Sequence, residues 1–439
     1  MKRRKKRGRP RVVWVLSGIL ALLLLVDAAA VGSFVIDKRR NASKETVYVP
    51  EKQGTEAEQE KEPGEVPGGT EPEVPQEKRA TLMAVGDNLI HTAVWQAGVQ
   101  EDGSHDYTVL YENIAEYLEK TDIRVINQET IFAGDEKGLQ DYPLFNSPEA
   151  IGHTIAGMGF NVILHASNHS LDMGQNGIVH AAKFWKEEHP EVTMVGIREE
   201  ADPKPEIPVI DVKGIRIALL NYTYSHNAET FSAYAEGYLN MLCDYDESTR
   251  RIDFGTIHPK VLEEIRQAEE LADFTIVFPH WGTEYTLTPT DQEVSFAKQM
   301  TQAGADLIIG THPHVPQPVE WISAENGNRA LCYYSLGNYT SAQNGIPQML
   351  GMMANLTIVQ DQERTYIEED SIKAIPLVTH FVYPGWTGST VVESTYLLKD
   401  YTDEQAAKHG LKRAWGITLT KKKLMDIAED TFGEYLSME

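Results

Sequence analysis

Residues that bind divalent metals recur at five places in the chain, each directly after a short and mostly apolar run. The runs and the motifs that follow them are Thr81–Val85 with GDNLIH, Ile123–Ile126 with NQE, Asn161–Leu164 with HASNH, Phe274–Phe278 with PHWGTEY, and Asp306–Ile309 with GTHPH. Imidazoles, carboxylates and an amide oxygen suit Mn, Fe or Zn, and the motifs hold no thiolate that would favour a structural zinc site. Because the set exceeds what one tetrahedral ion needs, the sequence predicts a site for two divalent ions.

The stretches between these motifs predict the elements that bring them together. Their periodicity is that of amphipathic helices at Val109–Lys120, Pro148–Met158, Gly174–His189, Pro259–Leu271 and Thr290–Ala303. Strands that alternate with helices form a mostly parallel sheet whose faces the helices cover. Ligands of such sheets bind outside the carboxyl ends of the strands. We therefore expect an α/β fold in which the five motifs converge on one crevice.

As a set, the motifs resemble those of a known family. GDNLIH, NQE, ASNHSLDMG, HWGTEY, GTHPHVPQPVE and YSLGNY occur in the order found in the CapA family of poly-γ-glutamate capsule synthesis proteins. That family is similar to the calcineurin-like metallophosphoesterases, which implies an αββα sandwich over residues 80–341. The resemblance also implies a set of metal ligands, namely Asp87, Glu129, Asn168, His280, His312 and His314. It further implies catalytic roles for His169 and Asn168, with His169 as a general acid or orienting group.

Three residues are weaker candidates for the site. The phosphoesterase motif Asp-x-His is replaced here by Asp87 and a histidine four residues later, His91. Glu284 is expected either to orient a ligand histidine or to be exposed to solvent. Asn338 belongs to a Gly-Asn pair, which favours a turn over a place in the site.

Other side chains near the motifs have structural interpretations. We expect His153 and His165 to be structural histidines, and Trp281 and Tyr285 to pack against neighbouring side chains. Asp172 precedes the expected helix at residues 174–189, and a helix cap is the default role for an aspartate at such a position.

The N-terminal region indicates export across a membrane. Residues 1–11 carry eight Lys and Arg, and the apolar run Val12–Ile36 that follows contains one charged residue, Asp27. As a helix this run is long enough to span a bilayer, and the positive charge before it predicts a cytoplasmic N-terminus with the main domain outside the cell. The alternative is a signal peptide cleaved near Ala28–Ala30, which would make the protein secreted. Residues 37–79 are rich in Glu, Pro and Gly and are expected to form a disordered tether.

The rest of the composition narrows the choice of partners. The net charge of −25 excludes nucleic acid as a partner of the main domain, and the two cysteines exclude a disulfide framework. Residues 342–439 are expected to add strands and helices that flank the main domain. Antiparallel strands are expected at Met353–Val359, Thr365–Lys373 and Ile375–Phe381, and helices at Thr402–His409 and Thr420–Phe432.

These observations predict a protein anchored in the cell membrane by residues 12–36. The resemblance to the CapA family implies that it acts in the synthesis, export or trimming of a surface polymer such as poly-γ-glutamate. As an enzyme it would be a metal-dependent hydrolase in which metal-bound hydroxide attacks the substrate. The alternative is a non-catalytic subunit that scaffolds a membrane polymer synthase and uses its metal only structurally.

Overall fold

In the computed structural model, the described residues are 77–202, 204–383 and 389–439. The expected basic tail, the apolar run Val12–Ile36 and nearly all of the expected tether lie outside these residues. Within them, no helix is both long and apolar enough to cross a membrane. The first strand begins at Lys78, inside the stretch that was expected to be tether.

The larger of the two main sheets in the described part of the chain is mixed. It has nine strands in the order β17-β16-β14-β1-β2-β3-β4, with β13 beside β1 and β15 beside β14. Their bounds are β1 Lys78–Asn88, β2 Ile123–Asn127, β3 Val162–Leu164, β4 Thr193–Val195, β13 Asn338–Thr340, β14 Leu350–Gln360, β15 Thr365–Ile367, β16 Lys373–Val382 and β17 Val391–Leu397. The strands β1 to β4 run parallel, whereas β14, β16 and β17 pair in antiparallel fashion on the other side of β1.

The smaller sheet has six strands in the order β11-β12-β10-β9-β6-β5. Their bounds are β5 Val209–Val212, β6 Ile215–Thr223, β9 Phe274–His280, β10 Leu307–Ile309, β11 Val319–Ser323 and β12 Arg329–Tyr333. The inner strands are parallel, and the edge strands β5 and β11 are antiparallel to their neighbours. A separate hairpin consists of β7 Cys243–Tyr245 and β8 Ile252–Ile257.

The α/β class is therefore confirmed, and the expectation of a mostly parallel sheet is wrong for the sheets as a whole. Parallel pairing joins the strands that carry the five motifs. Short connections, such as residues 213–214 between β5 and β6, can only join antiparallel strands, and they add such strands to both sheets. This mixed architecture fits a metallophosphoesterase-like fold.

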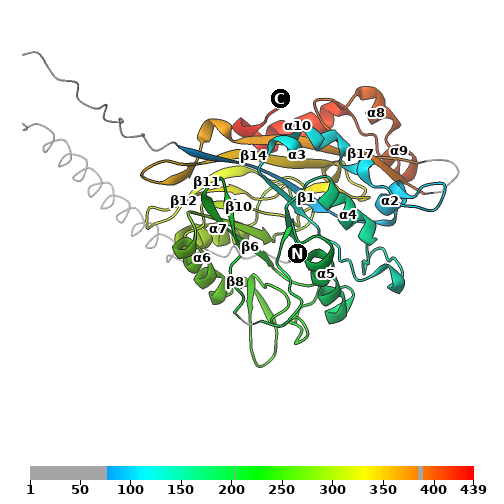
Figure 1. Cartoon of the computed structure of the whole chain (residues 1–439). Helices are drawn as coiled ribbons and strands as arrows, with labels where there is room; N and C mark the ends of the chain where they lie inside the picture. The colour runs from blue at the N-terminus through cyan, green and yellow to red at the C-terminus, as the bar shows by residue number, and fades with distance from the viewer. Residues whose placement is uncertain (1–76, 203, 384–388) are drawn as a thin grey trace, which may run out of the picture. The chain divides into compact units, whose positions relative to one another are not determined.

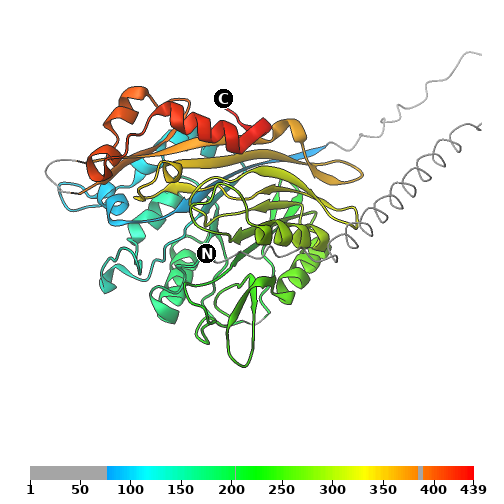
Figure 2. The ribbon, with the colours of Figure 1, turned by 180° about the vertical axis from the view of Figure 1, so that it is seen from behind.

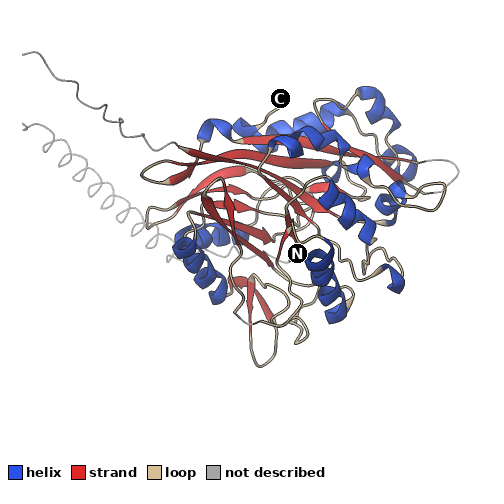
Figure 3. Cartoon of the chain, in the orientation of Figure 1, coloured by secondary structure: helices blue, strands red, loops and turns tan. Residues whose placement is uncertain are grey.

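The two sheets lie face to face with helices on their outer sides (Figures 1, 2 and 3). Helices α3 and α10 lie on the outer side of the larger sheet, and α6 and α7 pack against the smaller one. The bounds of the helices are α2 Thr92–Trp95, α3 Ala115–Lys120, α4 Glu149–Gly157, α5 Gly174–Glu188, α6 Pro259–Leu271, α7 Asp291–Ala303, α8 Asp403–Lys408, α9 Leu411–Trp415 and α10 Lys421–Phe432. Because both faces of the central strands are covered, these strands read as continuous apolar runs in the sequence.

Local chemistry sets the ends of the helices. The Thr290 side chain accepts a hydrogen bond from the Glu293 backbone, and the Glu293 carboxylate accepts one in return, which forms a capping box at the start of α7. Gly304 ends that helix with φ of 122°, a conformation that favours glycine. The helix expected at residues 109–120 is shorter than predicted, because its first half forms two 3₁₀ turns at Thr108–Leu110 and Glu112–Ile114.

Gly86 stands where the backbone of β1 passes closest to another chain segment. A Cβ atom at this position would lie 1.9 Å from the Gly337 carbonyl oxygen, which accepts a hydrogen bond from the Asp87 amide. We expect Gly86→Ala to lower the free energy of unfolding by at least about 1–3 kcal/mol, because the backbone cannot move aside without breaking this bond.

The matched control is Gly157→Ala at the exposed end of α4, where an added Cβ meets nothing within 4 Å. This substitution is expected to leave stability unchanged or slightly raised. Chemical denaturation of both variants of the full chain checks the pair, and equal effects would contradict the close approach at Gly86.

Candidate metal centre

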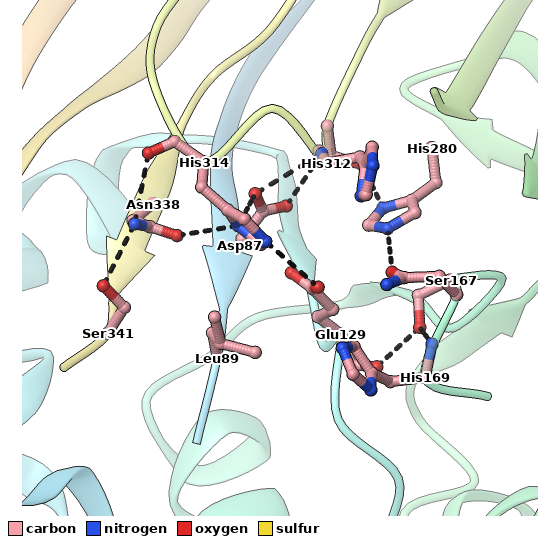
Figure 4. A network of polar contacts seen from close by, with 12 residues as sticks. Asp87, Leu89, Glu129, Ser167, His169, His280, His312, His314, Asn338 and Ser341 are labelled. Atoms are coloured by element: carbon pink, nitrogen blue, oxygen red, sulfur yellow. Dashed lines mark hydrogen bonds and ion pairs between the residues drawn. The ribbon is translucent and has the colours of Figure 1, made fainter. Parts of the chain in front are cut away.

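The carboxyl ends of strands from both sheets meet at one place in the molecule. The side chains gathered there are Asp87 near the end of β1, Glu129 after β2, Asn168 and His169 after β3, His280 at the end of β9, and His312 and His314 after β10. Figure 4 shows Asp87, Glu129 and the three histidines of the smaller sheet turned toward one another. His314 Nδ1 lies 3.0 Å from Asp87 Oδ2, although the two residues are 227 positions apart in the sequence. The fold thus brings these residues into one cluster.

Three overlapping groups of side chains within the described residues could each hold a metal ion. The groups are Glu129 with His280 and His312, Asp87 with Glu129 and His314, and Glu284 with His312 and His314. In each group the candidate ligand atoms lie within 4.8 Å of one another. Glu284 is exposed, whereas the other members are buried. The first two groups share Glu129, so its carboxylate lies between two possible ion positions.

Several of these donor atoms have no protein partner. Both carboxylate oxygens of Glu129 and the Nδ1 atom of His312 are buried, and the described residues offer them no hydrogen bond. Glu129 is 0% exposed, and the nearest cationic candidate, His314 Nε2, is 3.7 Å from its Oε1 atom. A buried carboxylate without hydrogen bonds is costly unless a cation offsets its charge. The residues present therefore fit a divalent ion.

Electrostatics separates the histidines into two kinds. Burial lowers the pKa of His280 and of His312 well below its ordinary value, so both imidazoles are neutral and able to bind a metal. Burial also lowers the pKa of His314, but Glu129 and the hydrogen bond with Asp87 outweigh it and raise that pKa to about 9. Burial raises the pKa of the Glu129 carboxyl well above its ordinary value.

Asp87 is held by several donors. Its Oδ1 atom accepts a hydrogen bond of 2.8 Å from Asn127 Nδ2, and the His312 amide lies 3.3 Å from the same oxygen. The Oδ2 atom contacts His314 Nδ1, which also lies 3.2 Å from Asn338 Oδ1. The Asn338 side chain therefore reaches the site through His314. The prediction that Asn338 belongs to a turn is wrong, because the residue is the first of strand β13.

The loop that carries His312 and His314 is strained. Both residues have left-handed backbones, with φ of 99° and 59°, which costs a non-glycine residue about 1–3 kcal/mol each. Gly310 begins this loop because a Cβ there would lie 2.0 Å from the Tyr334 carbonyl oxygen. Left-handed residues two apart turn both imidazoles into the same cluster (Figure 4).

His169 forms a pair with a carboxylate. Its Nδ1 atom lies 2.7 Å from Asp172 Oδ2, which also accepts a hydrogen bond of 2.8 Å from the Phe145 amide. The edge of the Phe145 ring meets the His169 ring at 4.8 Å between centroids. Asp172 is thus not a helix cap as expected, since α5 starts after Met173 without a side-chain cap.

Asn168 is oriented by a residue that the sequence did not indicate. Its Nδ2 atom donates a hydrogen bond of 2.9 Å to Asn227 Oδ1, and its Oδ1 atom lies 2.7 Å from His280 Nε2. Because Asn227 takes the amide nitrogen, the oxygen of Asn168 faces the cluster. Asn227 follows β6, whose end was not among the five predicted motifs. The sequence feature that could have indicated Asn227 is the polar run Tyr-Ser-His-Asn at residues 224–227, which directly follows β6.

The remaining candidates lie at or beyond the edge of the cluster. His91 belongs to none of the three groups found among the described residues. The Nδ1 atom of His91 accepts a hydrogen bond from the Ala342 amide. Burial lowers the pKa of this imidazole to about 4. Trp281 packs as expected and donates to the Tyr334 carbonyl. Tyr285 does not pack in the core: it is 50% exposed, and its ring centroid is 6.1 Å from that of His314.

The two histidines expected to be structural lie outside the cluster. His165 is buried against Phe132 and Trp185. His153 Nδ1 lies 2.8 Å from His189 Nε2 on the outer helices. Neither histidine belongs to a candidate ion group of the described chain.

Residues 81–343 match the family model described as "Bacterial capsule synthesis protein PGA_cap". The chain belongs to this family. The PGA_cap match confirms the resemblance to CapA that the motifs indicated, because the capsule biosynthesis protein CapA of Bacillus anthracis is also similar. That relative is 28% identical over 340 residues, which are 74% of this chain and 76% of its own.

Other similarities are more limited in length or strength. The PGA biosynthesis protein CapA of Bacillus subtilis (strain 168) is 30% identical over 187 residues, 42% of this chain and 44% of its own. A crystal structure of a hypothetical protein from Thermus thermophilus covers 68% of this chain and 99% of its own, at 13% identity and a TM-score of 0.36. That structural likeness is too weak to bear on function.

Asn227 provides a test of how the ligand cluster is oriented. We expect Asn227→Ala to weaken binding of Zn²⁺ by about 10–100-fold, because the Asn168 amide is then free to turn its nitrogen toward the site. Asn227→Asp keeps the acceptor for Asn168 and should retain most of the affinity. Isothermal titration of the metal-free full chain checks this, and equal affinities for the Ala variant and the unmodified protein would contradict it.

Proposed function

We propose that this PGA_cap protein is a metal-dependent hydrolase that acts on a surface polymer during capsule synthesis. The observation that carries the proposal is the buried Glu129 carboxylate, without hydrogen bonds, beside the free Nδ1 atom of His312. A hydrogen-bonded imidazole and carboxylate, His169 and Asp172, stand next to this cluster. A metal position beside a His–Asp pair is an arrangement suited to hydrolysis.

The side chains have separable roles in this proposal. Glu129, His280 and His312 would hold an ion, and the Asn168 oxygen faces the same position. When bound, the ion would polarise the scissile group and lower the pKa of a water ligand. Asp172 binds His169 at Nδ1, which leaves the Nε2 atom of that imidazole free to hold or deliver a proton.

The class of substrate is proposed from the relatives. The names of two similar proteins specify capsule biosynthesis and PGA biosynthesis. Poly-γ-glutamate is a chain of amide-linked residues, so its cleavage would be an amide hydrolysis and not a phosphoester hydrolysis. We propose that the site trims such a polymer, with partner subunits of a membrane polymer synthase supplying it.

A pair of substitutions separates catalysis from metal binding. We expect His169→Ala to reduce hydrolysis by about 10²–10⁴-fold, because the proton carrier is lost, while the metal content stays unchanged. Asp172→Asn should reduce hydrolysis by less, since the imidazole remains in place. The assay follows new amine ends on poly-γ-glutamate and, separately, release of p-nitrophenol from bis(p-nitrophenyl) phosphate.

His153→Ala, on the outer helix α4, is the matched control and should behave as the unmodified protein.

A different outcome would favour the alternative, a non-catalytic subunit that scaffolds a polymer synthase. If the metal-loaded chain cleaves neither substrate, and His169→Ala still supports capsule formation in cells, the hydrolase proposal fails.

We also propose that Val12–Ile36 anchors the chain in the cell membrane with the acidic domain outside. The sequence supports this through the eight basic residues before the apolar run. Protease added to intact cells stripped of their wall should then release the domain by cutting within residues 41–77. Protection of the domain until the membrane is lysed would contradict this topology.

A further inference from the structure

We infer that the cluster holds one tightly bound divalent ion, between Glu129, His280 and His312, and that hydrogen bonds within the protein close the second position around Asp87 and His314. This inference rests on the metal-binding part of the proposed function. It departs from the pair of ions that the sequence predicted. The two positions differ in how many of their ligand atoms are free of hydrogen bonds, and in the number of protein ligands.

At the first position three donor atoms have no hydrogen bond within the described chain. The two Glu129 oxygens and His312 Nδ1 have no hydrogen-bond partner among the described residues. The amide oxygen of Asn168, fixed by Asn227, forms a hydrogen bond of 2.7 Å with His280 Nε2, which brings a fourth possible ligand to this position. With the oxygen of Asn168 this position has four possible protein ligands of imidazole, carboxylate and amide type, and an ion that acts in hydrolysis there would hold its water as a fifth ligand. An ion here breaks no hydrogen bond of Glu129 or of His312 Nδ1. It would replace only the hydrogen bond between His280 Nε2 and Asn168 Oδ1, and both of these atoms would become its ligands.

At the second position the donor atoms are already used. Both Asp87 oxygens have partners, namely Asn127 Nδ2 at 2.8 Å and His314 Nδ1 at 3.0 Å. The backbone amide of His312 adds contacts of 3.3 and 3.4 Å to the same two oxygens. An ion bound by Asp87 would have to compete with these donors for the carboxylate lone pairs. An ion bound through His314 Nδ1 would have to break its hydrogen bond with Asp87, which leaves only the Nε2 atom of this imidazole, 3.7 Å from Glu129 Oε1, for a metal.

The second position also lacks a ligand. Two residues after Asp87, where the phosphoesterase motif Asp-x-His places its histidine, this chain has Leu89. Leu89 is 2% exposed, and its side chain offers no donor atom (Figure 4). His91, the nearest histidine along the chain, instead accepts a hydrogen bond from the Ala342 amide. The ligands left are Asp87, His314 and the shared Glu129.

The third group does not add an independent position. Glu284 could join His312 and His314, but these two imidazoles already belong to the other groups. Glu284 is exposed and lies on the open side of the cluster. We therefore assign one ion to the cluster, with Asp87 and His314 as a hydrogen-bonded pair beside it.

The experiment counts ions. The purified full chain is loaded with excess Zn²⁺ or Mn²⁺, dialysed, and measured by elemental analysis alongside isothermal titration of the metal-free form. We expect one ion per chain after dialysis, and any second binding event at least about 10–100-fold weaker. Two ions of equal affinity would overturn the inference while leaving the proposed function intact. An absence of bound ion would overturn both.

Three variants locate the ion. His280→Ala should lose the tight ion, whereas Asp87→Asn, which keeps the size of the side chain, should retain it. Leu89→His supplies the missing ligand and should raise the count toward two. Thermal melting of each variant shows which of them fold. Retention of the tight ion in His280→Ala, or its loss in a folded Asp87→Asn, would place the ion elsewhere and refute the assignment.

Discussion

The rest of this site depends on the burial of one carboxylate. Glu129 is fully buried after a parallel strand, where no described residue donates a hydrogen bond to its carboxylate. Moving an ionised carboxylate into such surroundings is among the most costly steps in folding, and the neighbouring Asp87 increases the repulsion. The neutral imidazoles of His280 and His312 can share a cation with this carboxylate but cannot neutralise it themselves. Without a bound cation, burial raises the pKa of this carboxyl and His314 is its nearest possible cation, whereas a divalent ion would let the carboxylate stay ionised.

The cluster also connects the two layers of the molecule. Asp87, Glu129, Asn168 and His169 follow strands of the larger sheet, whereas His280, His312 and His314 follow strands of the smaller sheet. Neither sheet holds a complete set of ligands. The distances across the cluster therefore depend on how the sheets pack, and a bound ion would fix that packing in return. The strained loop at His312 and His314 is packed closely against its neighbours, since a Cβ at Gly310 would lie 2.0 Å from the Tyr334 carbonyl oxygen and one at Gly337 would lie 2.8 Å from the Pro316 nitrogen.

The convergence of the ligands could largely be predicted from the sequence, because buried parallel strands consist of short runs of apolar residues. The ligands that follow those runs must meet, since parallel strands end on the same side of a sheet. The antiparallel pairing of β14 with β16 was predicted from residues 353–359 and 375–381 and is confirmed. That these strands extend the larger sheet beside β1 was not predicted, because it depends on which strands become neighbours. Asp172 was misassigned because the position before a helix gives the same signal for a cap and for a partner of His169. Asn227 and the exposed Tyr285 depend on loop conformations with positive φ, which spacing alone does not show.

The place where the domain begins has a mechanical consequence. Lys78 is the first residue of β1, a strand that lies inside the larger sheet between β14 and β2. From Lys78 to Ala84 this strand pairs with β14, and its other end carries Asp87. A pull applied to Lys78 along the axis of β1 would load the hydrogen bonds between β1 and its neighbouring strands in shear, all at once, instead of opening them one by one. A tension strong enough to shift β1 would also move Asp87, because both belong to the same strand. The first strand therefore couples a force applied at Lys78 to the ligand cluster.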